Sequence, residues 1–319
     1  MKLKLDLPIQ SSFKKLKLSD AIYLIGSCFS DEIGKELILN KFRVLSNPFG
    51  TIFNPSSIFK ILSGNIDPTN SVENNGVYYH WDAHSKVSSL DFQRIQKTIQ
   101  EKITASEKFL EKSKWLIITF GTAWIYKQKS SKNIVANCHK VDTSEFYKEL
   151  LDVKFIVDAF RDFKMHIIKT NPHINIILTV SPVRHTRDGL VENNRSKARL
   201  IEAVHDIVER FENVDYFPAY ETMIDELRDY RFYATDLVHP SDQAVDYLWS
   251  RLAETYFSSE TLSFIKEWQP IKTALNHKPF QPKSKAHQKF LKETLVKLEK
   301  LNEKIDLSVE IEEIKSQII

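Results

Sequence analysis

Residues 21–39 read AIYLIGSCFSDEIGKELIL, and this stretch decides the fold class. Its first five residues are an unbroken apolar run, which predicts a strand buried on both faces. Residues 31–39 place apolar side chains at helical spacing, which predicts a helix soon after the strand. Because Gly26, Ser27 and Cys28 lie between them, the sequence predicts a tight turn at the carboxyl end of the strand.

The same alternation of strand and helix patterns continues along the chain. Apolar runs predict further strands at residues 42–45, 115–120, 174–180 and 214–217. Helical patterns lie between them, at residues 92–109, 146–170 and 191–211. This order predicts a five-stranded parallel sheet with helices on both faces. Two stretches, 76–87 and 124–137, interrupt the rhythm and predict β-hairpins at the edge or carboxyl rim of the sheet.

The last part of the chain has a different composition. A helix is predicted from Ser241 to about residue 257, followed by an irregular, proline-containing segment over 268–282. Residues 284–319 are rich in Lys and Glu with leucines at helical spacing, which predicts an amphipathic helical tail. We therefore expect an α/β domain over 1–260. A helical extension over 261–319 would pack on that domain or on a partner, for example in a homodimer.

Composition narrows the range of partners. The 319-residue chain has a net charge of +3, which favours neither a nucleic-acid nor a membrane partner. No apolar run approaches the roughly 20 residues that span a bilayer, and the first residues do not resemble a signal peptide. Two cysteines, Cys28 and Cys138, are too few for a disulfide scaffold or a Cys-based zinc site. We expect a cytoplasmic protein that needs no metal or other cofactor.

Two distant segments together predict a catalytic triad. A side chain at Ser27 or Cys28 would lie over a helix N-terminus, where the dipole lowers a thiol pKa and free N–H groups can bind an oxyanion. The structural alternative is a capping serine beside a small buried cysteine. Asp236 and His239 are three residues apart, a spacing that lets a carboxylate orient an imidazole as a base.

The motifs of the chain resemble those of the GSCFA family, which is counted among the SGNH (GDSL-like) hydrolases. The similar segments are Gly26–Phe29, Asn47–Pro55, Trp81–Ser85, Gly121–Trp124, Asn137–Lys140, Ser181–His185, Asp225–Tyr230 and Asp236–Pro240. The resemblance implies a flavodoxin-like three-layer α/β fold with a five-stranded parallel sheet. It also implies ester-bond or acyl-transfer chemistry through an acyl-enzyme.

The resemblance also implies roles for individual residues. When the motif of GDSL enzymes is aligned on Gly26, the position of their nucleophile falls on Cys28, with Ser27 as the alternative. The resemblance further implies that His239 is the base and that Asp236 orients it. The N–H groups of Cys28 and Gly50 would form part of the oxyanion hole. Ala123 stands where GDSL enzymes have an asparagine as third donor. The candidates for a replacement donor are Thr122, Asn54, Asn137 and His84.

Further polar residues are expected to bind substrate. These are Asn54, His84, Asn137, His139, Arg184 and His185. Arg184 suits a carboxylate or phosphate, or else a salt bridge to acidic residues within 225–229. The stretch with His80 and Asp82 favours a hydrogen-bonding loop over a metal site. We expect an acyl hydrolase or acyltransferase acting on an O-acylated small molecule or carbohydrate. The alternative is a non-catalytic binding protein that retains the fold and pocket.

Overall fold

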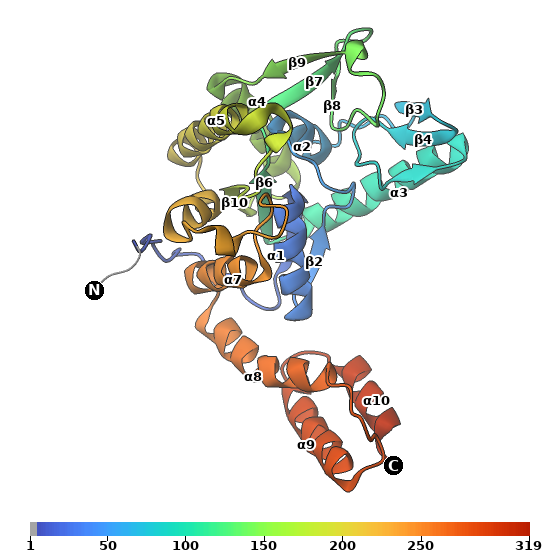
Figure 1. Cartoon of the computed structure of the whole chain (residues 1–319), viewed down its shortest axis with the longest axis vertical. Helices are drawn as coiled ribbons and strands as arrows, with labels where there is room; N and C mark the ends of the chain where they lie inside the picture. The colour runs from blue at the N-terminus through green and yellow to red at the C-terminus, as the bar shows by residue number, and fades with distance from the viewer. Residues whose placement is uncertain (1–4) are drawn as a thin grey trace. The chain divides into compact units, whose positions relative to one another are not determined.

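The computed structural model describes residues 5–319, which form two compact units. The first unit ends at Tyr256 and the second runs from Phe257 to Ile319 (Figure 1). This division lies a few residues before the boundary expected from the sequence at residue 260.

The first unit is built on a five-stranded parallel sheet with the strand order β11–β10–β6–β1–β2. The strands are β1 (Ala21–Gly26), β2 (Arg43–Ser46), β6 (Trp115–Phe120), β10 (Asn175–Val180) and β11 (Val214–Tyr216). Every residue of β1, β6 and β10 is buried, as expected for central parallel strands covered on both faces. The predicted five-stranded α/β fold is confirmed (Figure 1).

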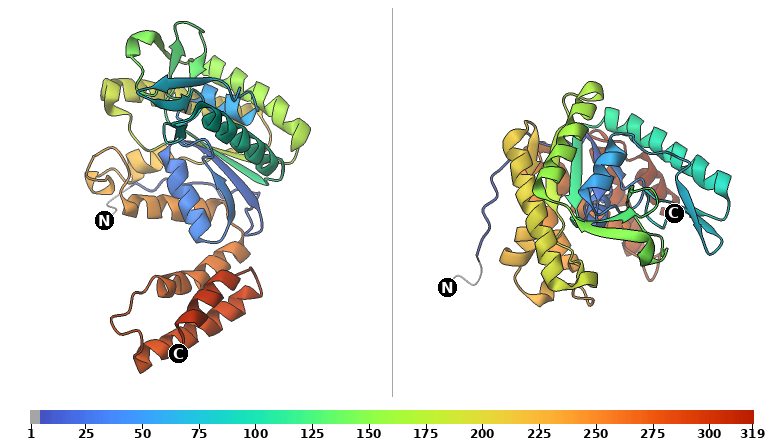
Figure 2. Two further views of the ribbon diagram at one scale, coloured as in Figure 1. Left: turned by 90° about the vertical axis from the view of Figure 1, so that its right-hand side faces the viewer. Right: turned by 90° about the horizontal axis from the view of Figure 1, so that it is seen from above.

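Helices cover both faces of this sheet (Figure 2). They are α1 (Cys28–Leu39), α2 (Pro55–Leu62), α3 (Phe92–Glu111), α4 (Val153–Thr170), α5 (Gly189–Arg210), the short α6 (Ala219–Glu221) and α7 (Asp242–Tyr256). Tyr23 and Ile25 of β1 join the core formed with α3, α4 and α5. Leu24 lies on the opposite face, toward Gly34 of α1, and α1 packs against α7. The sheet is therefore the middle of three layers.

Two small antiparallel sheets extend from this framework. One contains β3 (Ser71–Asn74), β4 (Val77–His80) and β5 (Ser88–Ser89), and it packs on α3 (Figure 2). The other contains β7 (Trp124–Gln128), β8 (Ile134–Val135) and β9 (Phe146–Leu150). Short 3₁₀ or π turns occupy Thr143–Glu145, Thr186–Asp188, Thr222–Glu226 and Tyr230–Phe232.

Two predictions for these segments are wrong in detail. The hairpin predicted over 76–87 corresponds to the antiparallel pair of β4 and β5 over 77–89, but the prediction missed β3, which pairs with β4 through a turn at Asn75–Gly76. The predicted helix over 146–170 begins only at Val153, because residues 146–150 pair with β7 as strand β9. Asp152 marks the true helix start, since its side chain accepts a hydrogen bond from the Phe155 N–H at 2.6 Å.

The second unit consists of helices α8 (Ser259–Leu275), α9 (Lys285–Asn302) and α10 (Ser308–Gln317). The irregular segment predicted over 268–282 is wrong for its first half, because Pro270 lies inside α8. Phe264, Trp268 and Ile271 are buried on this helix, and their burial offsets the hydrogen bond that proline cannot donate. The predicted helical tail is confirmed. Within residues 5–319, no helix combines the length and apolar character needed to cross a bilayer.

Candidate active site

The turn after β1 is fixed by its neighbours on both sides. Gly26 has a φ of +145°, and a Cβ at this position would lie 2.1 Å from the carbonyl oxygen of Thr119 on β6. The Ser27 N–H donates to that same carbonyl at 3.1 Å. On the other side, the Gly26 N–H donates to Oδ1 of Asn47 at 2.8 Å. Only glycine fits this close approach of two backbones.

Ser27 and Cys28 have different environments at this turn. Ser27 is fully buried, and its Oγ accepts a hydrogen bond from the Phe29 N–H as the cap of α1. Cys28 is the first residue of α1 and is partly exposed. Within residues 5–319, no carbonyl accepts the Cys28 N–H. Of the two predicted nucleophiles, Cys28 is the one that a substrate can reach.

The protonation of Cys28 differs from the sequence-based expectation. Burial raises the pKa of the Cys28 thiol above its ordinary value, and the charge of Asp31 raises it further. The N–H groups at the start of α1 and the charge of Lys197 lower this pKa but do not outweigh burial. The prediction of a helix-lowered thiol pKa is therefore wrong. Cys28 rests as a thiol that needs a base or a nearby cation.

Asp236 and His239 form the expected pair. His239 Nδ1 lies 2.7 Å from Asp236 Oδ2, and because a carboxylate only accepts, Nδ1 carries the proton. Oδ1 of Asp236 accepts from the N–H groups of His239 at 3.0 Å and Val238 at 2.9 Å. These hydrogen bonds, led by that from the His239 N–H, lower the pKa of Asp236 to about 2. His239 Nε2 makes no hydrogen bond with any residue of 5–319.

The Asp236–His239 turn is tied to the end of β10. The Arg184 N–H donates to the carbonyl of Val238 at 3.3 Å. The next residue, His185, interacts electrostatically with His239. Nε2 of His185 lies 3.2 Å from where a Cβ on Gly121 would be. The Asp236–His239 turn thus lies beside the loop that follows β10, and no hydrogen bond joins His239 to Cys28 in the described chain.

Two of the predicted oxyanion donors are already engaged. The Gly50 N–H donates to the Asn47 carbonyl at 2.7 Å, so this turn uses it internally. The Thr122 N–H donates to the carbonyl of Phe53 at 3.0 Å. The Thr122 hydroxyl pairs with Ser196 Oγ at 3.0 Å and accepts from the Trp124 N–H at 3.1 Å. The N–H groups of Gly50 and Thr122 are therefore both used within the fold, whereas no carbonyl of residues 5–319 accepts the Cys28 N–H.

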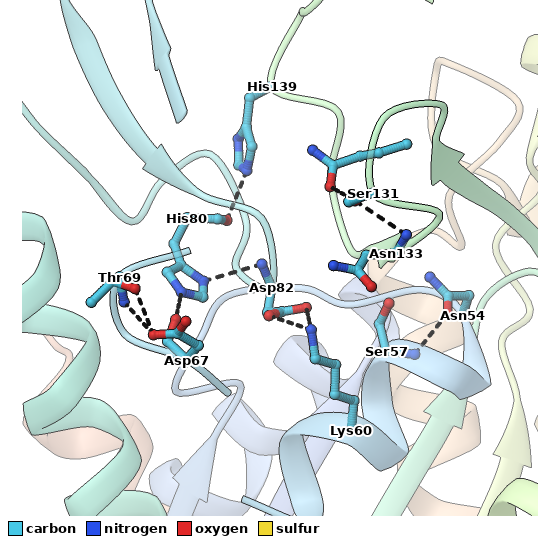
Figure 3. A network of polar contacts seen from close by, with 11 residues as sticks. Asn54, Ser57, Lys60, Asp67, Thr69, His80, Asp82, Ser131, Asn133 and His139 are labelled. Carbon is cyan, nitrogen blue, oxygen red and sulfur yellow. Dashed lines mark hydrogen bonds and ion pairs between the residues drawn. The ribbon is translucent and has the colours of Figure 1, made fainter. Parts of the chain in front are cut away.

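Asn54 offers a side-chain donor nearby. Its Oδ1 caps α2 by accepting from the Ser57 N–H at 2.8 Å (Figure 3). This bond assigns the amide orientation and leaves Nδ2 without a hydrogen-bond partner in residues 5–319. Asn54 follows Phe53, whose carbonyl accepts the N–H groups of both Gly121 and Thr122. The Nδ2 group is therefore a donor close to the turn where Ala123 replaces the expected asparagine.

A cavity of about 710 Å³ lies beside these residues. Five of the predicted site residues line it, namely Asn54, Thr122, Asn137, His139 and His185. Trp124 and Tyr126 add aromatic surface, and residues 137–143 form much of the opposite wall. The other predicted site residues are not part of the lining, namely Ser27, Cys28, Gly50, His84, Arg184, Asp236 and His239. The cavity is mixed in character, with amide, hydroxyl and aromatic groups, as in sites for small polar ligands.

His139 and the loop with His80 are committed to internal hydrogen bonds. His139 is 2% exposed, its Nε2 donates to the His80 carbonyl at 2.9 Å, and its Nδ1 accepts from Ser85 Oγ at 3.0 Å. Burial lowers its pKa to about 4. Asp82 is buried and ion-paired with Lys60 at 2.7 Å (Figure 3). His139 therefore stabilises the cavity wall and has no ring nitrogen left for a substrate.

The remaining predicted residues have distinct positions. His185 is mostly buried against Phe53, its Nε2 has no hydrogen-bond partner in residues 5–319, and burial lowers its pKa to about 4. Arg184 donates to the Tyr233 hydroxyl at 2.8 Å and makes no salt bridge to residues 225–229. The His84 side chain lies against Gly50. Asn137 Oδ1 accepts from the His139 N–H at 2.8 Å.

Sequence reasoning missed Lys197 and Ser196 on α5. Ser196 Oγ accepts from the Ala123 N–H at 2.7 Å, and Lys197 is buried beneath the same turn. A signal was present, because Lys197 is in helical phase with Leu200, Val204 and Ile207 on the buried face of α5. A lysine on an apolar helix face is rare enough to mark a special environment.

The chain thus has a three-layer α/β fold with a five-stranded parallel sheet, and an Asp236–His239 pair lies beside the loop after β10. Residues 21–252 match the GSCFA family, and residues 268–319 match the GSCFA domain protein, C-terminal domain. The chain belongs to the GSCFA family. No curated protein matches it.

Three solved structures are similar at low identity. One is a carbohydrate esterase family 3 protein from Talaromyces cellulolyticus, with 8% identity and a TM-score of 0.33 over 78% of this chain and 99% of that one. A family two carbohydrate esterase from Clostridium thermocellum has 13% identity and a TM-score of 0.32, over 82% of this chain and 67% of that esterase. Est2A, an acetyl xylan esterase from Butyrivibrio proteoclasticus, has 13% identity and a TM-score of 0.31, over 78% of this chain and 67% of Est2A. These values are too low to transfer a residue role or a substrate.

Proposed function

We propose that the protein is an SGNH-type acyl hydrolase or acyltransferase whose nucleophile is Cys28. The observation that carries this proposal is the Asp236–His239 hydrogen bond of 2.7 Å, which holds the imidazole with a basic Nε2 outward. The accessible Cys28 at the start of α1 supplies the nucleophile. The burial of Ser27 and its hydrogen bond as the cap of α1 support Cys28 over Ser27 in that role.

The reaction follows from these groups. His239 Nε2 removes the proton of the Cys28 thiol, and the sulfur attacks the acyl carbonyl of the ester. The resulting oxyanion is stabilised by the Cys28 N–H and by Asn54 Nδ2 in place of the missing asparagine. Collapse releases the alcohol, which takes the proton from His239, and leaves a thioester on Cys28. Water, or an acceptor hydroxyl in a transferase, then attacks the thioester as His239 takes its proton. The acyl group leaves as a carboxylic acid, or as a new ester, and the proton returns from His239 to the Cys28 sulfur.

The cavity supports a small polar ester as the substrate. The amides of Asn54 and Asn137 and the rings of Trp124 and Tyr126 are groups that bind hydroxylated molecules such as sugars. We therefore propose an O-acylated small molecule or carbohydrate, with its alcohol part in the cavity. The acyl group would then lie toward Cys28.

A panel of chromogenic and sugar acetyl esters tests this function. The wild type should hydrolyse at least one ester, and mass spectrometry of the quenched enzyme should find the acyl group on Cys28. Cys28→Ala and His239→Ala should each abolish turnover, whereas Ser27→Ala should retain it. Activity that survives His239→Ala would contradict the triad. An absence of turnover together with an unreactive Cys28 would favour a non-catalytic binding protein.

A further inference from the structure

Two amides in the lining of the cavity are oriented by hydrogen bonds within the fold. Oδ1 of Asn54 accepts from the Ser57 N–H at 2.8 Å. Oδ1 of Asn137 accepts from the His139 N–H, also at 2.8 Å. These bonds assign both amide orientations and leave each Nδ2 without a hydrogen-bond partner in residues 5–319. Each amide therefore offers a ligand its N–H groups, while its oxygen is already bonded to the protein.

Two cations line the same cavity from different segments. Arg187 lies in the turn after β10, and Lys140 lies in the wall formed by residues 137–143. Neither side chain forms a hydrogen bond or an ion pair with the part of the chain that the structure describes. Burial raises the pKa of Cys138 in that wall to about 11, and the charge of Arg187 acts against this rise. Arg187 therefore faces the wall that carries Asn137 and Lys140.

The carboxylates of the lining do not cancel these two cations. Asp188 is ion-paired with Lys148, which is not part of the lining. Oδ1 of Asp142 accepts from the Ser144 N–H at 2.8 Å and caps the short turn that follows. Among residues 5–319, Asp142 is the one lining carboxylate without a cation partner, against two lining cations without a carboxylate partner. The cavity is therefore left with an excess of positive charge.

An anionic group fits these walls better than the hydroxyls of a neutral sugar. A carboxylate accepts hydrogen bonds and donates none, so it needs only donors from the protein. Each sugar hydroxyl also brings a proton, which needs an acceptor, and the amide oxygens of the lining are already in use. Hydrogen bonds from a guanidinium or an ammonium to an anion are stronger than those between neutral groups. The volume of about 710 Å³ has room for an anion on a sugar-sized molecule.

We propose that the cavity binds a carboxylate or phosphate group carried by a sugar-sized molecule, and that Arg187, Lys140 and Asn137 Nδ2 hold this group. The inference rests on the proposed function in one respect, namely that the bound molecule is the alcohol part of the ester. Asn54 Nδ2 then stays with the acyl carbonyl. The substrate class is accordingly an O-acylated acidic sugar or sugar phosphate. Binding of the anion itself does not require turnover.

The primary experiment measures the binding of three probes to the wild-type protein by isothermal titration calorimetry. Glucuronate carries a carboxylate, glucose 6-phosphate carries a phosphate, and glucose is the neutral reference. We expect at least one of the two anions to bind about tenfold or more tightly than glucose at low salt. About 0.5 M sodium chloride should remove much of this preference, because the two cations are exposed to solvent. Equal binding of all three probes, or no binding of either anion, would overturn the proposal.

Matched variants locate the anion in the cavity. Asn137→Asp keeps an oxygen for the His139 N–H but replaces the donor with a negative charge, and it should weaken anion binding about tenfold. Asn133→Asp makes the same charge change at an exposed residue outside the lining and should have little effect. Arg187→Gln should also weaken anion binding about tenfold, whereas Arg195→Gln, on the exposed surface of α5, should not. Anion affinities that Asn137→Asp and Arg187→Gln leave unchanged would place the anion elsewhere and overturn the proposal.

A kinetic comparison separates this inference from the proposed function. If the anions bind as expected but no acetylated sugar is hydrolysed, the anion site is supported and the proposed function fails. If acetylated neutral sugars are hydrolysed and neither anion binds, the proposed function is supported and the anion site fails. Where both hold, acetylated glucuronate should have a KM about tenfold below that of acetylated glucose, and Arg187→Gln should remove this difference.

Discussion

The two halves of the candidate triad are held in different ways. The Gly26–Cys28 turn is tied to Thr119 on one side and Asn47 on the other. The side chains of Asp236 and His239 are each 48% exposed, and their turn is held by hydrogen bonds to the Asp236 carboxylate and by backbone hydrogen bonds with Ala234 and Arg184. The candidate nucleophile is thus fixed by the sheet, and the candidate base is carried on a surface loop. Under the proposed function, we expect His239 to need less strand movement than Cys28 to reach a productive position.

The largest effect is expected when either half of the candidate triad is removed. Cys28→Ala and His239→Ala should each reduce kcat by about 10³-fold or more, because base and nucleophile act as one unit. The double variant should be no slower than the slower single variant. Steady-state kinetics on the best ester measures this, and additive losses would show that the two residues act independently.

The close contact at Gly26 predicts a large loss of folding stability when this glycine is replaced. Gly26→Ala should reduce the free energy of unfolding by about 3 kcal/mol or more, since its Cβ would lie 2.1 Å from the Thr119 carbonyl oxygen. Gly76→Ala is the matched control, because Gly76 also has a positive φ but no atom within 4 Å of the added Cβ. Chemical denaturation compares them, and equal losses would show that only backbone strain matters.

The amide of Asn54 can be tested separately from its role as a helix cap. Asn54→Asp keeps an oxygen for the Ser57 N–H but removes the donor. We expect kcat to fall about 10²-fold with little change in the free energy of unfolding. Asn54→Ala should lose both activity and about 1 kcal/mol of stability. Full activity in the Asp variant would require another oxyanion donor.

The buried charge of Lys197 should make stability depend on pH. Its folded-state pKa of about 7 lies below the unfolded value, so the unfolded chain binds the additional proton above pH 7. Stability should therefore rise with pH, by about 1.4 kcal/mol per unit, until the unfolded lysine also loses its proton. Relative to Lys197→Met, the wild type should gain stability from neutral to alkaline pH. A constant difference would contradict a buried cation.

The smallest effect concerns Ser27. Ser27→Ala removes the cap of α1 and should cost about 1 kcal/mol in unfolding experiments. Its kcat should stay close to that of the wild type, in contrast to Cys28→Ala. Loss of activity with an intact fold would return the nucleophile to Ser27.

The central sheet was predictable because its strands are apolar runs such as residues 115–120, whose burial depends on few other residues. Strand β9 was not predictable, because it pairs with β7, more than fifteen residues earlier in the chain. In addition, the sequence of β9 runs directly into a helical pattern. Pro270 led to the opposite error, an irregular segment predicted where a helix continues. Proline normally breaks a helix interior, but here the packing of Trp268 and Ile271 outweighs that tendency.

For the candidate site too, the features set by local contacts could be predicted, and those set by distant contacts could not. The Asp236–His239 pair was predictable because both partners lie in one short turn. The roles of His139 and Lys197 were not, since these depend on carbonyl groups supplied by distant segments, namely His80 for His139, and Gly121 and Ser181 for Lys197. The engagement of the Gly50 N–H likewise follows from the turn conformation rather than from the residue type.

The contact between Gly26 and Thr119 also bears on how substrate preference can diversify. The two backbones leave no room there for a side chain, and β1 pairs with β6 up to this point. Under the proposed function, residues 137–143, which line the cavity, are a part of its wall that can vary without disturbing this contact. Under the proposed function, insertions or substitutions in that loop would alter which ester is accepted, while Cys28 keeps its position at the start of α1.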